Sequence, residues 1–268
     1  MLSIITLAGI ISAVAAHGTV SGIVADGIYY IGYNPSMQYI TPNPATVGWK
    51  TPKDLDNGFI APAAYANADI ICHVGAGNAQ AAAPIKAGGK VNLQWTPWPT
   101  THKGPVLDYL ANCNGPCETA DKSKLKWFKI GESALIDPKK MTNGYWATDQ
   151  LIANNNTWTI TIPTSIATGN YVLRHEIIGL HAAGQANGAQ NYPQCFNLAV
   201  KSSGTENPDG VLATTFYKAT DPGIKFDLYS AFTSYTIPGP PLYASAITVS
   251  QTAPPKPTAS ATGVYTVF

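Results

Sequence analysis

The chain has 268 residues, of which 45% are hydrophobic and only 12% are charged, and its formal net charge is +1. A charged share near half the usual one, without a basic block, argues against nucleic acid and anionic membranes as partners and favours an uncharged polymer. No apolar run reaches the roughly twenty residues needed to cross a bilayer, so we expect a soluble protein with no membrane segment.

Residues 1–16 form a short apolar segment that ends in the small residues of 13–16, which is the pattern of a secretory signal peptide with its cleavage site. Cleavage there releases a secreted protein that begins at His17. A terminal histidine offers both a backbone amine and a ring nitrogen to one ion, whereas an internal histidine offers only its ring. We assign the domain to residues 17–250, a length that suits one large β domain.

Alternating apolar and polar residues predict strands at 91–95, 125–130, 158–162 and 171–178. The 24 glycines and 21 prolines indicate many turns and long loops, and no long stretch has helical periodicity. We therefore expect an all-β protein in which antiparallel sheets pack through one face, with long loops that contain short helices.

Two histidines lie just after predicted strands, where functional residues are often found. His102 lies in a proline-rich loop after the strand at 91–95, and His181 follows the strand at 171–178. Downstream of His181, Gln190 and Tyr192 point to the same face if their segment is extended. The remaining internal histidines, at positions 73 and 175, are interpreted as structural.

The chain has four cysteines, and an even number of cysteines in a secreted protein usually forms disulfides within the chain. We therefore expect two disulfides. The four cysteines allow three connectivities. The turn-forming residues 114–116 favour a bond between Cys113 and Cys117, which leaves Cys72 to pair with Cys195. The second bond closes a long loop, for which the chain-entropy model gives roughly 4–5 kcal/mol. Zinc is disfavoured because no CxxC pair is present.

Two further segments carry signals of modification or disorder. Asn155 begins the one Asn-X-Thr/Ser sequon that lacks a proline, and we expect it in a surface turn before the strand at 158–162. Residues 251–268 are rich in Pro, Thr, Ser and Ala, a composition typical of disordered, O-glycosylated tails.

Three nitrogens can surround one metal ion: the amine and ring of His17 and the ring of His102. A planar nitrogen set with a weak axial oxygen favours Cu(II) over zinc, and Tyr192 is the natural source of that oxygen. His181 and Gln190 can form an outer shell that orients small oxygen species by hydrogen bonds. We therefore predict one copper ion per chain, with His17, His102 and Tyr192 as its ligands.

From His17 to Tyr243 the sequence resembles the fungal cellulose-active lytic polysaccharide monooxygenases of auxiliary activity family nine, formerly glycoside hydrolase family sixty-one. The matching segments are His17-Gly18, DIICH at 69–73, LQWTPWP at 93–99, HKGPV at 102–106, YLA at 109–111, YVLRHEIIGLH at 171–181, GAQNYPQC at 188–195, DPGI at 221–224 and IPGPPLY at 237–243. The resemblance implies an immunoglobulin-like antiparallel β-sandwich with a flat face around the copper. It also implies that His17 and His102 form the histidine brace, and it agrees with both disulfides and with the roles of Tyr192, His181 and Gln190.

The same resemblance implies a function. Family members oxidise crystalline cellulose at C1 or C4 of a glucose unit, using an external electron donor and hydrogen peroxide or dioxygen, and some also cut soluble glucans or hemicelluloses. We therefore expect cellulose or a related β-glucan as substrate for a secreted, monomeric enzyme. Tyr229 resembles a surface tyrosine of the family, and Tyr33 and Tyr243 are further candidates for contact with sugar rings.

Two other functions compete with that of a copper monooxygenase. A hydrolase needs two carboxylates, but only 15 acidic residues are present, and Glu176 lies beside Arg174, the single arginine, which favours a structural ion pair over a general acid. A non-catalytic secreted carbohydrate- or copper-binding β-sandwich is the second alternative. The presence of His181, Gln190 and Tyr192 together favours an intact enzyme.

Overall fold

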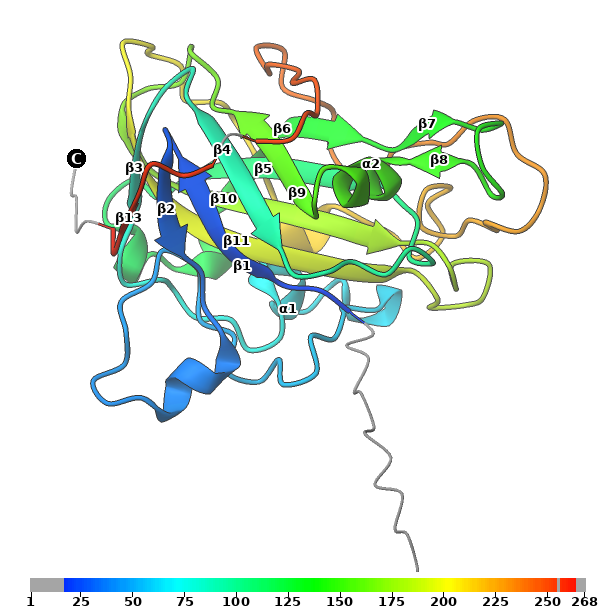
Figure 1. Cartoon of the computed structure of the whole chain (residues 1–268), viewed down its shortest axis with the longest axis horizontal. Helices are drawn as coiled ribbons and strands as arrows, with labels where there is room; N and C mark the ends of the chain where they lie inside the picture. Colours follow the sequence, from blue (N-terminus) through cyan, green and yellow to red (C-terminus); the bar gives the residue numbers. More distant parts are fainter. Residues whose placement is uncertain (1–16, 255, 264–268) are drawn as a thin grey trace, which may run out of the picture.

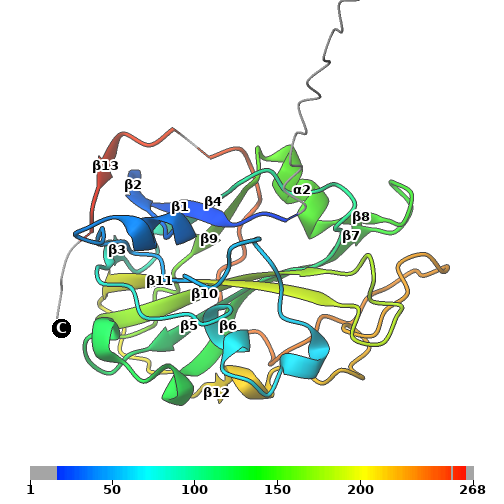
Figure 2. The same ribbon diagram turned by 90° about the horizontal axis from the view of Figure 1, so that it is seen from below.

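The computed structural model describes residues 17–254 and 256–263, so the expected signal peptide at 1–16 lies outside the described residues. Two β-sheets face each other as layers, with β1, β2 and β4 in one and β5, β10 and β11 in the other (Figures 1 and 2). The order is β13-β2-β1-β4-β9 in the five-stranded sheet and β12-β6-β5-β10-β11-β3 in the six-stranded sheet, and β7 pairs with β8 apart from both. The prediction of an all-β sandwich is confirmed.

The strands are β1 (Val20–Ala25), β2 (Ile28–Ile31), β3 (Ala83–Lys86), β4 (Lys90–Trp95), β5 (Val106–Asn112), β6 (Lys126–Ser133), β7 (Leu135–Asp137), β8 (Tyr145–Trp146), β9 (Thr157–Thr161), β10 (Gly169–Gly179), β11 (Gln190–Lys201), β12 (Val211–Leu212) and β13 (Ala259–Ala261). The α-helices are α1 (Asp69–Cys72) and α2 (Ala147–Ala153), and five short 3-10 helices lie in the connections. The expected short loop helices are therefore present.

The four strands predicted from alternation correspond to β4, β6, β9 and β10. Most neighbouring strands pair antiparallel, as expected, and β10 runs beside β11 over its whole length. Two edge strands depart from this pattern, because β3 pairs parallel with β11 and β13 pairs parallel with β2. Each of the two large sheets therefore ends, at one edge, in a strand that runs parallel to its neighbour.

The prediction that each sheet packs through one face is wrong for the six-stranded sheet, because β10 is buried at every residue. Its residues Tyr171, Leu173 and Ile177 belong to the core between the sheets. The alternate residues Val172 and Ile178 belong to a second core on the outer face, which also contains residues of α1, β5 and β6 and of the loops near 49–65 and 213–228. Long loops therefore cover the outer face and give this sheet two apolar sides.

Part of the predicted tail at 251–268 contacts the sandwich, while its disorder stays a prediction. The side chain of Gln251 accepts a hydrogen bond from the backbone N of Thr159 at 2.9 Å and donates one to its carbonyl at 2.8 Å, at the edge strand β9. The chain then reaches β2 at the opposite edge of the same sheet, where β13 pairs with it (Figure 1). Unpaired backbone groups on edge strands attract an extended segment of any composition that can pair with them.

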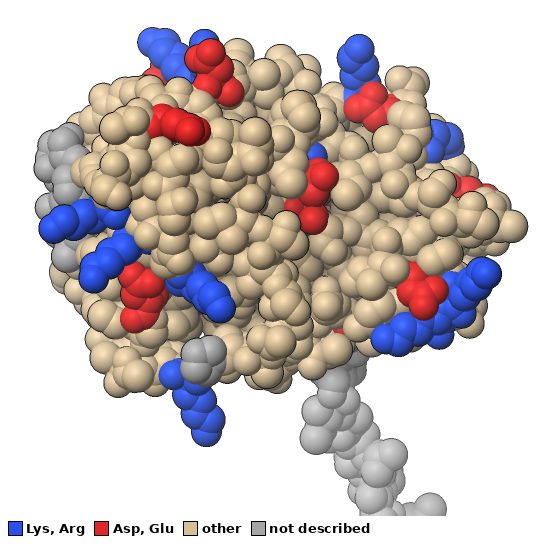
Figure 3. Space-filling view, turned by 90° about the horizontal axis from the view of Figure 1, so that it is seen from above, with Lys and Arg blue, Asp and Glu red and all other residues tan. Residues whose placement is uncertain are grey.

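The surface carries few charges. Figure 3 shows basic and acidic side chains interspersed within a larger uncharged area on the face that it presents. Within the described residues, no helix has the length and apolar character required to span a membrane.

Candidate metal centre

Five of the predicted site residues come together at one end of the sandwich. His17 precedes β1, His102 lies in the loop after β4, His181 follows β10, and Gln190 and Tyr192 begin β11. The His17 ring centroid lies 5.4 Å from that of His102 and 5.5 Å from that of Tyr192. The rings of His102 and His181 are 3.8 Å apart.

Trp98 supports this cluster from within the core. Its indole Nε1 donates to the His102 carbonyl at 3.0 Å, and its ring meets that of Tyr192 edge to face with centroids 5.0 Å apart. Gly18 allows the start of β1 to approach this indole, since a Cβ atom at Gly18 would lie 3.1 Å from Trp98 Cε3. The small residue next to His17 therefore lets this histidine lie against the aromatic support.

A buried ion pair holds the backbone that follows His102. The Nζ of Lys103 donates to both carboxylate oxygens of Asp149 in α2 at 2.9 Å and to the Gly144 carbonyl at 3.0 Å. The Lys103 carbonyl accepts a hydrogen bond from the N of Leu180 at 2.8 Å. Because Leu180 precedes His181, this bond fixes the backbones of the two stacked histidines relative to each other.

Tyr192 is fully buried, and its hydroxyl donates to Gln190 Oε1 at 2.5 Å. Burial raises the pKa of the Tyr192 hydroxyl well above its ordinary value, with a further contribution from the charge of Asp54. The hydroxyl therefore stays protonated at neutral pH. The phenol and the Gln190 amide form one bonded pair beside the His17 ring.

Burial lowers the pKa of His102, and repulsion from the neighbouring His181 and His17 adds to this effect, so that the pKa falls to about 4. Burial also lowers the pKa of His181, again with a contribution from His17. Both imidazoles are therefore neutral at pH 7, which is the form that binds metals.

The residues fit a bound copper ion in three respects. His102 Nδ1 lies 3.0 Å from Thr101 Oγ1, which leaves Nε2 without a hydrogen-bond partner within the described chain. Two rings that share one ion at about 2 Å from a nitrogen need centroids within roughly 6.5 Å, and those of His17 and His102 are 5.4 Å apart. Nδ1 of His181 is buried without a hydrogen-bond partner among the described residues, which leaves it available to a group that the protein itself does not supply.

No group of three or more His, Cys, Asp or Glu side chains gathers as a metal site within the described part of the chain. A set of two histidine rings and one terminal amine is not such a group, because its third nitrogen belongs to the backbone. The arrangement thus suits the predicted nitrogen set only when His17 is the first residue.

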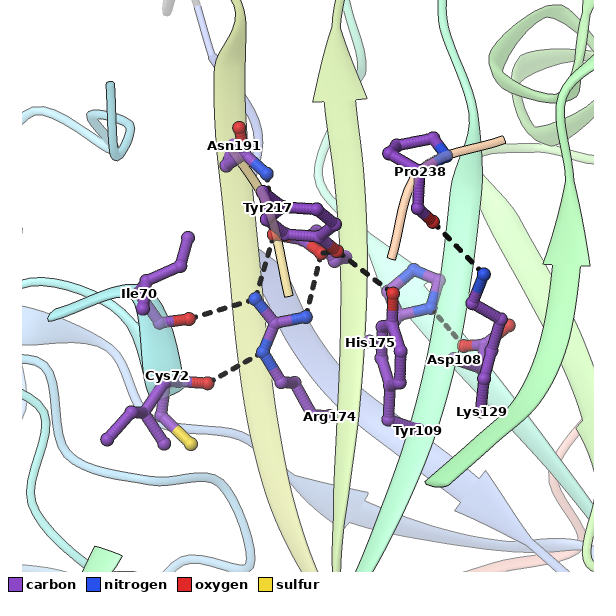
Figure 4. Close-up of polar contacts among 12 residues, drawn as sticks. Ile70, Cys72, Asp108, Tyr109, Lys129, Arg174, His175, Asn191, Tyr217 and Pro238 are labelled. Carbon is purple, nitrogen blue, oxygen red and sulfur yellow. Dashed lines mark hydrogen bonds and ion pairs between the residues drawn. The ribbon is translucent and has the colours of Figure 1, made fainter. Parts of the chain in front are cut away.

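A buried polar network lies on the outer face of β10 and β11, the face that α1 covers (Figure 4). Arg174 forms a two-pronged ion pair with Glu176 at 2.7 and 2.8 Å, and both side chains are fully buried. Asn191 donates to Glu176 at 2.9 Å, and the hydroxyl of Tyr217 also donates to this carboxylate. The structural ion pair expected from the sequence is confirmed. Its burial leaves Glu176 unable to reach a polymer as a general acid.

His175 is structural, as interpreted from the sequence. It is fully buried, with Nδ1 2.6 Å from Asp108 Oδ1, and its Nε2 accepts a hydrogen bond from Trp95 Nε1 at 2.9 Å. The second oxygen of Asp108 accepts from Trp158 Nε1 at 3.1 Å. This chain of bonds joins the two sheets through the core.

The sequence reasoning missed Phe59, which lies beside the metal centre. Its ring centroid is 6.0 Å from that of His17 and 6.1 Å from that of Tyr192, and the side chain is 36% exposed. The only sequence signal is an aromatic residue in a turn-rich loop, which is too common to single out. The contact depends on a fold that brings residues 42 positions apart together.

Of the three candidate substrate tyrosines, Tyr229 is the one that is largely exposed. It is 66% exposed, and its segment is tied to the loop after His181 by a hydrogen bond from the N of Phe226 to the Ala183 carbonyl. The expectation for Tyr33 is corrected because this side chain is only 6% exposed and belongs to the core. A buried ring cannot lie against a polymer surface.

The expectation for Tyr243 is corrected as well. Its hydroxyl bonds to Ser165 Oγ at 2.7 Å and to Glu206, and its ring packs on Phe128. Ser165 precedes β10 whereas His181 follows it, and an eleven-residue strand spans about 35 Å. Tyr243 therefore lies toward the opposite end of the sandwich.

Both disulfides occur as predicted, between Cys72 and Cys195 and between Cys113 and Cys117. The first joins the end of α1 to β11. Asn155 is exposed in the turn between α2 and β9, which is the expected environment for the sequon, and its occupancy stays a prediction.

The chain is similar to known proteins of one family. The family model of Auxiliary Activity family 9 (formerly GH61) matches residues 17–236. The chain is 71% identical over 263 residues to AA9 family lytic polysaccharide monooxygenase I of Botryotinia fuckeliana, covering 98% of each chain. It is 53% identical to AA9 family lytic polysaccharide monooxygenase cel61A of Hypocrea jecorina, covering 88% of this chain and 68% of that one.

Solved structures match as well. The extended catalytic domain of H. jecorina LPMO9A superposes with a TM-score of 0.88 at 50% identity, covering 93% of this chain and all of that one. Cel61B from H. jecorina, described as a glycoside hydrolase family 61 member, superposes with a TM-score of 0.78 at 43% identity, covering 85% and 100% of the two chains.

Proposed function

The chain belongs to Auxiliary Activity family 9, the lytic polysaccharide monooxygenases, and from this premise we propose that it is a secreted enzyme that oxidatively cleaves the β-1,4-glucan chains of cellulose. It would use one copper ion, an external electron donor, and hydrogen peroxide or dioxygen, and would attack C1, C4 or both. The main support for this function is that the rings of His17, His102 and His181 lie close together beside the Tyr192–Gln190 pair.

The terminal residue defines the proposed metal site. In the precursor the nitrogen of His17 is an amide, which is a poor metal ligand. Removal of residues 1–16 would free this nitrogen as an amine, so that His17 binds through two nitrogens and His102 through Nε2. Copper bound there would supply the redox chemistry that activates the oxidant for attack on a C–H bond.

The surrounding residues have distinct proposed tasks. The buried Tyr192 would cover one side of the metal and keep water from it, since its ring lies against that of His17. Gln190, bonded to the Tyr192 hydroxyl, and His181, with its unpaired Nδ1, would orient the small oxidant by hydrogen bonds. The neutral imidazole of His181 can donate or accept a proton at that position.

The substrate is proposed from the surface around the centre. A packed crystalline polymer cannot enter a pocket, so it requires exposed side chains that lie beside the metal. Tyr229 is exposed on one neighbouring loop and is the candidate for apolar contact with a glucose ring. The low charged share of the chain, 12%, suits an uncharged partner.

The test combines mass measurement with product analysis. We expect the intact mass of the secreted protein to correspond to a chain that starts at His17 and gains one copper ion. With cellulose, copper and ascorbate, we expect oligosaccharides oxidised at C1 or C4, and none without the reductant. The variant His102→Ala should lose both the copper and the oxidised products.

Two outcomes would contradict the proposal. Unoxidised products formed without copper or reductant would indicate a hydrolase. Binding to cellulose with copper present but with no oxidised sugar would favour a non-catalytic carbohydrate- or copper-binding protein.

A further inference from the structure

A terminal residue is attached to the fold through one peptide bond, so its ring depends on side-chain contacts for its orientation. The His17 ring has Phe59 as an edge-on neighbour, with ring planes inclined by 72°. Phe59 lies on a separate loop from the three site histidines and Tyr192. A role for this loop at the His17 ring rests on the proposed copper function.

Gly58, the residue before Phe59, is held through both its backbone N and its carbonyl. The N of Gly58 donates to Asp54 Oδ1 at 2.7 Å, and the Gly58 carbonyl lies 3.1 Å from Nε2 of His73. Nδ1 of His73 accepts a hydrogen bond from the N of Val74 at 2.9 Å, so the neutral ring carries its proton on Nε2 and donates it to Gly58. Asp54 and His73 are 4% and 1% exposed, so water does not compete for these bonds.

His73 is itself fixed to the sandwich. It follows α1, whose last residue, Cys72, forms the disulfide with Cys195 of β11. The buried guanidinium of Arg174 donates to the carbonyls of Ile70 and Ile71 in the same helix at 2.9 and 2.8 Å. His73 has a φ of 95°, a backbone conformation that side chains rarely adopt and that persists only when surrounding contacts enforce it.

The peptide unit after Phe59 is fixed as well. The N of Ile60 donates to the Asn191 carbonyl at 2.8 Å, and the N of Asn191 donates to the Ile60 carbonyl at 3.1 Å. Asn191 lies between Gln190 and Tyr192. Phe59 is therefore held between two anchored peptide units, although its side chain is partly exposed.

We propose that Phe59 is a positioning residue for the imidazole of His17, and that the buried Asp54–His73 pair sets the place of Phe59. An exposed aromatic residue that only contacts a substrate does not need both adjacent peptide units to be anchored in this way. The ring instead restricts rotation of the terminal histidine on the side that Tyr192 and His102 leave open. This role differs from substrate contact because it acts on the metal geometry in the absence of polymer.

The experiment measures Cu(II) in the processed protein without substrate. For Phe59→Ala we expect a changed copper hyperfine splitting in the electron paramagnetic resonance spectrum and about tenfold weaker Cu(II) binding in a chelator competition, as for loss of other outer-shell support. Leu55→Ala is the matched control, because Leu55 lies on the same loop and is 71% exposed. It should retain the wild-type spectrum and affinity.

Two variants of the buried anchor test the second half of the proposal. His73→Leu removes the donor to Gly58 and should change the spectrum in the same direction as Phe59→Ala. His73→Gln keeps an N–H donor and should restore much of the wild-type spectrum. If His73→Leu fails to fold, Phe59→Ala still decides the test, because replacing a partly exposed side chain should leave the protein folded.

The outcomes separate this inference from the function on which it rests. A wild-type protein that starts at His17 but binds no copper would overturn the proposed function and this role with it. If the wild-type protein binds copper and the Phe59→Ala variant has the same spectrum and affinity as the wild type, the role of Phe59 alone is overturned. Weaker cellulose binding with that unchanged spectrum would assign Phe59 to the substrate instead.

Discussion

The ion pair under His102 offers a quantitative test of how the fold supports the site. Lys103→Met keeps most of the aliphatic stem but removes the ammonium group, and so leaves Asp149 without its cation. The two side chains are 11% and 8% exposed, so little solvent replaces the lost bonds. Breaking a buried ion pair costs about 3–5 kcal/mol.

The lower end of this range is expected, because Asp149 keeps its hydrogen bond from the N of Trp146 at 2.8 Å. A loss of about 3 kcal/mol lowers the thermal midpoint by roughly 6–12 °C in a domain of this size. Cu(II) affinity should fall by about tenfold, since Lys103 adjoins His102 and its carbonyl binds Leu180. Urea unfolding of the copper-free protein and a chelator competition measure the two effects.

A double-mutant cycle and a surface control complete the test. Asp149→Asn alone should also destabilise, whereas Lys103→Met with Asp149→Asn should cost less than the two losses added together, because no unpaired charge remains. Lys124→Met removes a lysine that is 83% exposed in its pair with Asp121 and should change stability by less than about 1 kcal/mol. Additive losses, or a Lys103→Met variant as stable as the surface control, would refute the reasoning.

Four further outcomes are expected. A protein that retains one extra residue before His17 should lose tight Cu(II) binding, because an amide cannot replace the amine, and full binding in a calorimetric titration would contradict the proposed site. Glu176→Gln should lower the free energy of unfolding by about 3–5 kcal/mol, since it leaves the Arg174 charge buried, and an unchanged urea midpoint would count against this. The pKa of His102 is lower in the fold than in the unfolded chain, so its contribution makes the copper-free protein less stable as the pH falls from about 6.5 to about 4; a proton NMR titration of the ring with a midpoint near 6.5 would disprove this. Removal of residues 251–268 should cost about 2 kcal/mol through the lost edge hydrogen bonds and leave Cu(II) affinity unchanged, as measured by unfolding and competition.

Local patterns were sufficient for several features because each depends on neighbouring residues. Period-two alternation located β4, β6, β9 and β10, since half-buried strands place successive side chains on opposite faces. The turn residues between Cys113 and Cys117 indicated the short disulfide, and elimination then indicated the long one. The adjacency of Arg174 and Glu176 on one strand indicated their ion pair, because residues two apart share a face.

Other features depend on contacts between distant segments, which alternation and composition do not encode. The burial of both faces of β10 follows from loops that fold over the sheet, and the pairing of β13 follows from the free edge of β2. Tyr33 and Tyr243 carried the right chemistry for sugar contact, but only the packing decided that one is buried and the other lies toward the far end.

By itself, the sequence determined the class of fold, the two disulfides and the donor residues of the proposed metal site, because residue types and short spacings carry that information. Only the tertiary structure decided which side chains surround those donors. Phe59 meets His17 because His73, anchored through α1 and β11, holds the loop that carries it. Such a contact is set by the summed packing of several elements, so no local pattern in the chain reveals it.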